Sequence, residues 1–437
     1  MDKPSLSNDH NVYILGAGFG VEARLPLIRD FMNYMRDADL WLAQEGGPEA
    51  MRKDEREAIR EVLEFRLRAS AAAYRVPLNV DNIEDLFSLA AASDSLTLSE
   101  SMTTAIAATL DYARNLGPAP LAPTPMNDPT FMMGRLPKTN DGWVKPNDWG
   151  PVSFPPMETA GEKRDWYACP PYQFYVGVMA NYFTGLREGA FRHDTIITFN
   201  YDTLVEDSLK TLDVPFSYGT VLDDQQTEAR LRILKLHGSV NWGIQRPKKF
   251  AGMDTISLSE ARRIKTAAKM IPDLHKFQDY TALRKASMAP VIVPPTWQKG
   301  GEPHLADVWD DAVKALRTAT RVVIIGYSIP PTDTHFKYLL AAGLQDSISL
   351  RKVYCVNPAL KDDEIHCPLK QRMLSVFRRE HFEQGVIEFV PEGVRGFLSD
   401  STWRQSIGRF LNSPTAESDQ AAPWKLYLPQ PAQFMKL

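Results

Sequence analysis

Three polar side chains that could act on a nucleotide ribose follow two short apolar runs of the chain. Asn200 and Asp202 come after the run 195–199, and His237 comes after the run 233–236. If both runs are parallel strands of one sheet, their carboxyl ends meet at the edge where such sheets bind ligands. A carboxamide, a carboxylate and an imidazole would then share one crevice. This set suits chemistry on a ribose, because an imidazole titrates near neutral pH and can accept a proton from a hydroxyl group or from water.

A glycine-rich turn near the start of the chain predicts a phosphate-binding site. The segment Asn11–Leu15 reads as a buried strand, and Gly16, Ala17 and Gly18 follow it before a helical pattern. Glycines permit a tight turn and a close approach of backbone N–H groups to a pyrophosphate, while the N-terminus of a helix favours negative charge. Val21 occupies the position of the third glycine in the usual dinucleotide fingerprint. An ordinary dehydrogenase of the Rossmann type therefore fits poorly.

Together with Pro26 and Arg29, these motifs resemble the sirtuin family, in its bacterial sirtuin-like branch. The glycine turn, the proline and the arginine have the order and spacing found in that family. The segment 322–328, which ends in Gly-Tyr-Ser, and the segment 353–358, which ends in Asn-Pro, continue the resemblance. The segments 294–297 and 326–333 are more similar to the sirtuin-like effectors of anti-phage defence than to protein deacylases.

The resemblance implies roles for the polar residues first considered. Asn200 would position the ribose and the attacking water, Asp202 would hydrogen-bond the nicotinamide carboxamide, and His237 would accept the proton. Capping of the following helix is the alternative for Asn200 and Asp202, since both residue types cap helices well. For His237 the alternative is a polar residue satisfied at a strand end. The cofactor-binding residues implied in the same way are Gly16, Ala17, Gly18, Phe19, Arg29, Gly326, Ser328 and Asn357.

Four of these cofactor-binding residues have specific roles and specific alternatives. Phe19 would cover the nicotinamide ribose, and Arg29 would clamp the pyrophosphate through two parallel hydrogen bonds. A core phenylalanine and a solvent-exposed arginine are the alternatives. Ser328 and Asn357 would hydrogen-bond ribose hydroxyls or phosphate oxygens. Because Asn357 precedes a proline, a simple extended strand exit is its alternative.

Alternating strand-like and helical patterns predict an α/β fold, a Rossmann-like doubly wound parallel sheet with a large inserted helical subdomain. The interval between the first two strand-like runs is far too long for one crossover. We expect a sirtuin-like NAD-binding catalytic domain at 1–400, with a helical subdomain and proline-rich loop inserted at 40–190, a short helical insert at 244–288, and a C-terminal helix and tail at 401–437. The strand-like runs are 12–15, 195–199, 233–236, 291–293, 322–325, 353–356 and 386–390.

Composition narrows the class of protein. A formal net charge of −4 gives no indication of a nucleic-acid partner. The chain has three cysteines that lie far apart in the sequence: Cys169, Cys355 and Cys367. Because their number is odd, we do not expect a disulfide framework, and we expect the protein to be located in a reducing cytoplasm. No signal-like segment opens the chain, and no apolar run is long enough to span a bilayer. We therefore expect a soluble, cytoplasmic protein that does not bind a membrane.

The cysteines also bear on the reaction. Deacylating sirtuins usually hold a structural zinc ion with two Cys-x-x-Cys pairs, and this sequence contains no Cys-x-x-Cys. We therefore expect that the protein holds no metal ion. We expect it to be an NAD hydrolase that uses water to produce nicotinamide and ADP-ribose. The resemblance further implies an abortive-infection effector that depletes NAD, a homo-oligomer, and control by a HerA-like ATPase or another defence partner. An NAD-dependent protein deacylase and a non-catalytic sensor of NAD or ADP-ribose are the alternatives.

Overall fold

The computed structural model describes most of the predicted catalytic domain. The predicted tail 401–437, the segment 294–297 and most of the proline-rich loop 117–156 lie outside the described residues. None of the helices that the structure describes is both long and apolar enough to cross a membrane. The described residues are 10–43, 52–73, 75–76, 78–92, 96–115, 138–139, 142–143, 170–180, 194–219, 231–245, 273–293, 305–330, 334–345, 347, 349–361 and 367–399.

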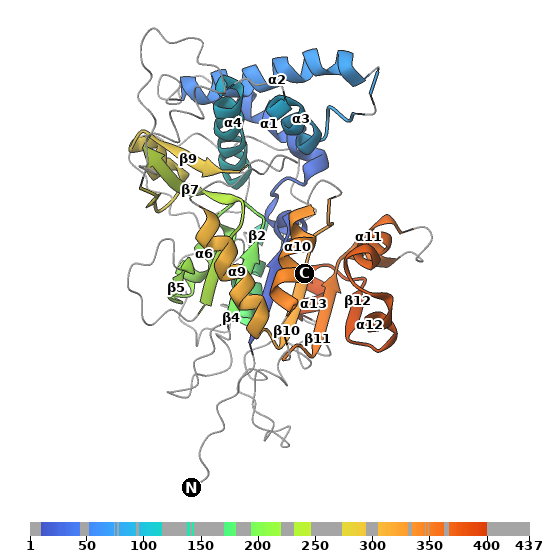
Figure 1. The fold of residues 1–437 in the computed structure, drawn as a ribbon. Coiled ribbons are helices and arrows are strands. Elements are labelled where there is room, and N and C mark those ends of the chain that lie inside the picture. The colour runs from blue at the N-terminus through green and yellow to red at the C-terminus, as the bar shows by residue number, and fades with distance from the viewer. Residues whose placement is uncertain are drawn as a thin grey trace.

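A parallel seven-stranded sheet forms the centre of the larger part of the fold (Figure 1). Its strands are β1 (Asn11–Leu15), β4 (Asp194–Thr198), β5 (Phe216–Ser217), β6 (Leu231–Lys235), β10 (Arg321–Ile325), β11 (Lys352–Val356) and β12 (Ile387–Val390). Their order is β12-β11-β10-β1-β4-β6-β5, and every neighbouring pair is parallel. After β1 the chain first forms the strands on one side of it (β4, β5 and β6) and then those on the other side (β10, β11 and β12). This reversal confirms the predicted doubly wound, Rossmann-like sheet.

Helices cover this sheet, which explains why β1 and β10 are buried along their whole length. Helices α9 and α10 pack against each other, and α5 packs against α6 and α13. Their bounds are α5 (Pro170–Met179), α6 (Leu204–Thr211), α9 (Ala306–Thr318), α10 (Thr334–Leu344) and α13 (Val394–Ser399). Shorter helical elements are η1 (Ala17–Ala23), η2 (Ile28–Asp30), η7 (Pro358–Lys361), α11 (Pro368–Val376) and α12 (Arg379–Glu383). Two further strands of two residues each, β2 (Lys138–Thr139) and β3 (Gly142–Trp143), pair antiparallel with each other.

A second unit, which we call the small module, lies beyond the carboxyl edge of the sheet (Figure 1). It combines helices that follow β1 with an antiparallel sheet of order β8-β7-β9. The two parts share one hydrophobic core, in which Met35 and Ile106 of the helices join Leu283 and Ile292. The elements are α1 (Phe31–Leu42), α2 (Lys53–Ala73), α3 (Ile83–Ala92), α4 (Leu96–Asn115), β7 (Gly238–Gln245), β8 (His275–Lys276), α8 (Tyr280–Lys285) and β9 (Met288–Ile292).

The small module differs from the sequence-based prediction in three respects. The run 291–293 was expected in the main sheet, but β9 pairs antiparallel with β7 instead. The described part of the predicted helical insert 244–288 contains β8 as well as α8. Helix α1 begins at Phe31, before the predicted start of the helical insert at residue 40. An apolar run indicates that a strand is buried, but it does not identify the strand's partner.

The turn after β1 packs directly on the turn after β10. The Gly16 N–H donates to the carbonyl of Ile325 at 3.0 Å, and the Gly18 N–H donates to the carbonyl of Gly326 at 2.9 Å. A Cβ atom on Gly18 would lie 2.7 Å from the Gly326 oxygen, and one on Gly326 would lie 2.4 Å from the Phe19 nitrogen. Glycine is required on both sides because the two backbones touch.

Gly326→Ala is expected to lower the free energy of unfolding by about 3 kcal/mol or more, because a left-handed backbone is strained for alanine and the two turns must also separate. The matched control is Gly385→Ala. Gly385 has a similar φ of +70°, against +64° for Gly326, but nothing lies within 4 Å of its added Cβ. The control should therefore lose only about 1–2 kcal/mol to backbone strain. Equal losses in chemical denaturation of the two variants would contradict the role of the close contact.

Candidate functional site

Asn200 and His237 occupy equivalent positions at the carboxyl edge of the sheet. Strands β4 and β6 are parallel neighbours, and each of the two residues lies two positions beyond the last paired residue of its strand. The buried His237 ring makes an edge contact with Phe199 at a centroid distance of 5.1 Å and a tilted contact with Tyr201 at 6.0 Å. Phe199 and Tyr201 flank Asn200 in the chain. The structure thus brings the predicted imidazole beside the segment that carries the predicted carboxamide.

Asn200 also connects this segment to the glycine turn. Its Nδ2 donates to the carbonyl of Gly16 at 3.0 Å, and its backbone N–H donates to Oγ1 of Thr198 at 3.1 Å. The first bond spans the ends of β1 and β4, next to the point where the strand order reverses. A doubly wound sheet binds its ligand at this reversal. The carboxamide is therefore held in a fixed orientation at the expected ligand position.

Asp202 lines a pocket between the sheet and the small module. Its Oδ1 accepts a hydrogen bond at 3.0 Å from the N–H of Leu204, the first residue of α6. Burial raises the pKa of the Asp202 carboxyl, and the ammonium group of Lys235 partly offsets this effect. Apolar residues form much of the pocket wall. The polar residues that line it are Asp111, Arg114, Asp202, Thr203 and Tyr280.

A buried lysine holds the backbone that carries Asp202. The side chain of Lys235 is only 1% exposed, and its Nζ lies 2.9 Å from Oε1 of Glu206. The same Nζ donates to the backbone carbonyl of Asp202. Oε1 of Glu206 also accepts from the Tyr218 hydroxyl at 3.1 Å, and Nδ2 of Asn241 donates to that hydroxyl at 3.3 Å. This buried chain of polar contacts links β6, α6 and β7.

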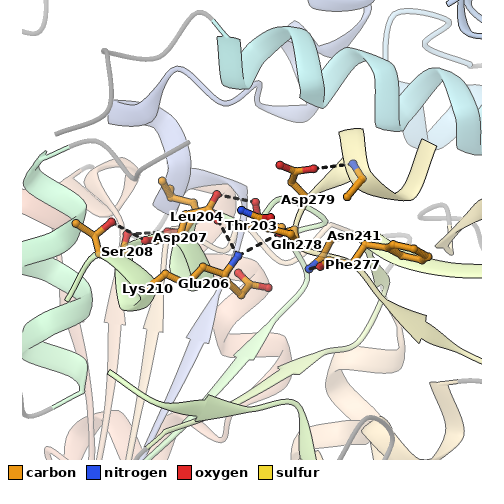
Figure 2. A network of polar contacts seen from close by, with 12 residues as sticks. Thr203, Leu204, Glu206, Asp207, Ser208, Lys210, Asn241, Phe277, Gln278 and Asp279 are labelled. Carbon is orange, nitrogen blue, oxygen red and sulfur yellow. Dashed lines mark hydrogen bonds and ion pairs between the residues drawn. The ribbon is translucent and has the colours of Figure 1, made fainter. Parts of the chain in front are cut away.

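Figure 2 shows polar contacts that connect α6 to the small module. The buried carboxylate of Asp207 accepts from the Thr203 hydroxyl at 2.8 Å and lies 3.3 Å from both Nη2 of Arg114 and Nζ of Lys210. Burial raises the pKa of Asp207, and Arg114 and then Lys210 oppose this effect. Lys210 also donates to the carbonyl of Gln278 at 3.1 Å. Helix α6 is therefore tied both to α4 and to the segment before α8.

Two predicted cofactor-binding side chains do not line the pocket at Asp202. Phe19 is buried in the core, where its ring contacts Tyr172 edge-on at 5.2 Å and its carbonyl accepts from the Tyr172 hydroxyl. The Arg29 side chain is 81% exposed and lies 3.4 Å from Asp30. These positions match the alternatives of a core phenylalanine and a solvent-exposed arginine. A cofactor role for Phe19 and Arg29 stays a prediction.

The other predicted cofactor-binding residues lie at the carboxyl edge and make bonds within the protein. The N–H of Gly18 is used by the turn after β10, so it is not a phosphate donor in this conformation. Ser328 is exposed, and its backbone carbonyl accepts from Nε of Arg372 at 2.9 Å. Oδ1 of Asn357 accepts from the Ala359 N–H at 3.0 Å and begins η7. Their roles, and that of Ala17, stay predictions.

The cysteine positions offer neither a reactive thiol nor a metal site in the part of the chain that is described. Burial raises the pKa of Cys355 to about 12, so its thiol stays protonated at neutral pH. Sγ of Cys367 accepts from the Lys370 N–H at 3.4 Å and caps the start of α11. Across the described ranges, no group of three or more His, Cys, Asp or Glu side chains is placed to hold a metal ion.

Sequence-based reasoning missed the polar residues that surround Asp202. Lys235 carried one signal, since a lysine interrupts an otherwise apolar run two positions before His237. Arg114 and Asp111 carried none, because they lie in a helix whose contact with the pocket depends on packing far along the chain. The structure thus adds to the predicted site a buried lysine and two charged residues from the small module.

A family model described as a SIR2-like domain matches residues 194–372. The matched segment begins at β4, ends in α11, and contains Asn200, Asp202 and His237. The comparison with curated proteins gave no match.

Several solved structures align over most of the chain at low identity. A triple mutant of a Sir2 homologue in complex with 2′-O-acetyl ADP-ribose is 12% identical, with 95% of this chain and 100% of that chain covered and a TM-score of 0.35. A mutant Sir2 homologue in complex with ADP-ribose is 12% identical, with 96% and 99% covered and a TM-score of 0.33. A structure described as the basis of sirtuin substrate affinity is 12% identical, with 89% and 91% covered and a TM-score of 0.31.

Proposed function

We propose that this chain, whose residues 194–372 match a SIR2-like domain, is an NAD hydrolase that cleaves the bond between nicotinamide and ribose with water. The hydrogen bond from Nδ2 of Asn200 to the Gly16 carbonyl, at 3.0 Å, is the observation that supports this most. It joins the turn expected to hold the pyrophosphate to the carboxamide expected to orient the ribose. His237 follows the neighbouring strand, beside the same segment.

The proposed reaction requires a leaving group, a nucleophile and a proton acceptor. The bond from the ribose C1′ to the pyridinium nitrogen breaks, its electron pair goes to the nitrogen, and neutral nicotinamide leaves. The ribose passes through a state with oxocarbenium character, and a water oxygen bonds to C1′ and loses a proton. Asn200 would orient the ribose and the water, and His237 would take the proton. Asp202 would accept a hydrogen bond from the carboxamide NH₂ group.

The surroundings of this site favour hydrolysis over deacylation. A deacylase needs an open groove for an acyl-lysine, whereas a hydrolase needs only water in a closed pocket. The sequence lacks the two Cys-x-x-Cys pairs of the usual zinc module. After His237 the chain continues directly into β7, which pairs with β9, and β9 packs against α4. This arrangement supports water as the acceptor of ADP-ribose.

The biological role that we propose is depletion of NAD during anti-phage defence. It is supported by the resemblance of the segments 294–297 and 326–333 to sirtuin-like defence effectors. Unregulated hydrolysis would harm the host cell, so we also propose control through a homo-oligomer or a partner such as a HerA-like ATPase. Light scattering of the purified chain, with and without a candidate partner, tests this part of the proposal. A monomer that is fully active without a partner would contradict it.

Incubation of the purified chain with NAD, with and without a candidate partner, should release nicotinamide and ADP-ribose in equal amounts. Asn200→Ala is expected to lower kcat about 100-fold or more, because the ribose and the water lose their orienting group. The matched control is Asn33→Ala, which changes an exposed residue of α1 and should leave kcat unchanged. Saturable binding of NAD without turnover, or consumption of an acyl-peptide in step with NAD, would contradict hydrolysis.

A further inference from the structure

The pocket at Asp202 is lined by an acidic and a basic side chain from different parts of the fold. Asp202 lies in the loop after β4, and Arg114 lies in the last turn of α4 in the small module. Apolar wall is contributed by Leu25, which follows the glycine turn, and by Val240 of β7. The apolar wall, the hydrogen-bond acceptor and the donor match the chemical groups of an aromatic ring that carries an amide.

The other acidic residue of this pocket is neutralised within the small module. Oδ2 of Asp111 accepts from Nη2 of Arg52 at 2.8 Å, and Arg52 also binds Glu55 at 2.6 Å. The carboxylate of Asp111 is therefore held by an arginine that is not among the pocket-lining residues. This leaves Asp202 and Arg114 as the pair of opposite charge that is best placed to meet a ligand.

The position of Arg114 is fixed by a buried anion. Its Nη2 lies 3.3 Å from Oδ2 of Asp207, which also accepts from the Thr203 hydroxyl. A guanidinium group has five N–H donors in a planar fork, so it can bind a carboxylate and a second acceptor at the same time. Thr203 follows Asp202 directly in the chain. The same carboxylate therefore fixes both Arg114 and the loop that carries Asp202.

A primary carboxamide presents one acceptor oxygen and one donor NH₂ group side by side. An ionised carboxylate can only accept hydrogen bonds, so Asp202 in its ionised form would bond to the NH₂ group and leave the carboxamide oxygen to another donor. We propose that Arg114 determines substrate specificity at this site by donating to the carboxamide oxygen of nicotinamide while Asp202 accepts from the NH₂ group. This inference rests on the proposed function and adds to it a residue of the small module.

Arg114 could instead serve only to neutralise Asp207, so the test separates the two roles with three free ligands. Nicotinamide has both the oxygen and the NH₂ group, 3-acetylpyridine has the oxygen alone, and 3-methylpyridine has neither. The test compares the double variant Arg114→Met/Asp207→Asn, which removes the guanidinium together with the buried charge beneath it, with Asp207→Asn alone. Asp202→Asn is the third variant, because its amide oxygen can still accept from the Leu204 N–H while its NH₂ group becomes a donor.

Titrations followed by ligand-observed NMR measure the affinities without any turnover. Relative to Asp207→Asn, the double variant is expected to bind nicotinamide and 3-acetylpyridine about tenfold more weakly and 3-methylpyridine equally well, since a hydrogen bond to a charged group is lost for the first two ligands. Asp202→Asn should weaken the binding of nicotinamide by a similar factor and leave the affinity for 3-acetylpyridine nearly unchanged.

The inference is overturned if the double variant binds all three ligands more weakly by the same factor, or if it binds all three as tightly as Asp207→Asn does. It is also overturned if the wild-type chain does not bind nicotinamide. Failure of the proposed function gives a different result. Binding of nicotinamide that depends on Arg114 as described, in a chain that does not cleave NAD with or without its partner, would contradict hydrolysis and support the role of Arg114.

Discussion

His237→Ala is expected to reduce nicotinamide release by a factor of about 10²–10⁴, the usual contribution of a positioned general base. The imidazole lies beside the segment of Asn200 and contacts the Phe199 and Tyr201 rings. Alanine removes the group that would take the proton from the attacking water. Initial rates of nicotinamide release at saturating NAD measure this effect.

The control for this prediction is a histidine away from the site. His381 is exposed in α12, so His381→Ala should keep the wild-type rate. Circular dichroism of both variants should match the wild-type spectrum, which would show that the fold is retained. Activity that survives His237→Ala and Asn200→Ala together would exclude this edge of the sheet as the catalytic site.

Lys235→Met is expected to lower the free energy of unfolding by about 3–5 kcal/mol, because it leaves a buried carboxylate without its counter-ion. The Lys235 side chain is 1% exposed, and its Nζ lies 2.9 Å from Oε1 of Glu206. Adding Glu206→Gln to the variant should restore part of the loss, since the uncompensated charge is then removed. Urea denaturation of the single and double variants measures both effects.

A lysine in an exposed ion pair provides the contrast. The Lys53 side chain is 73% exposed in its pair with Glu57, so Lys53→Met should change stability by no more than about 0.5 kcal/mol. If Lys235→Met proved equally mild, the buried contacts of Lys235 would not hold the loop of Asp202.

The loss in Lys235→Met should also depend on pH. Burial raises the pKa of Asp202 and Lys235 opposes this, so removing Lys235 raises the pKa of Asp202 further. A carboxyl whose pKa is higher in the folded state binds more protons there, so stability falls as pH rises through the interval between its two pKa values. The deficit of the variant should therefore be smaller at about pH 5 than at about pH 8. A deficit that grows on acidification would contradict the coupling.

The strands of the main sheet were predictable because helices bury them on both faces. Val12–Leu15 and Val322–Ile325 read as continuous apolar runs for this reason, and both lie in the sheet. Strand β7 was not predicted, since Gly238, Asn241 and Gly243 interrupt any apolar pattern. It forms because β9 pairs with it. Local sequence indicates burial but not the partner that a strand finds.

The same distinction separates the predicted from the unpredicted parts of the site. Asn200, Asp202 and His237 follow strand ends, where sheet topology alone gathers side chains at one edge. Arg114 reaches the pocket only through packing of α4 against elements far along the chain, which no local pattern encodes. Phe19 follows the glycine turn at the expected spacing, yet its apolar ring is buried in the core. Motif spacing predicted where the backbone goes better than where the side chains point.

The contact between the turns at Gly18 and Gly326 has an evolutionary consequence. Most packing clashes can be relieved when a neighbouring side chain becomes smaller, but here each turn meets the other through backbone atoms. Neither partner has a side chain left to shorten, so no second substitution can compensate for a first. Descendants of this chain are therefore free to change the pocket wall supplied by α4 while the paired turns stay fixed. Substrate preference can diverge in this fold without altering the edge that would hold the dinucleotide.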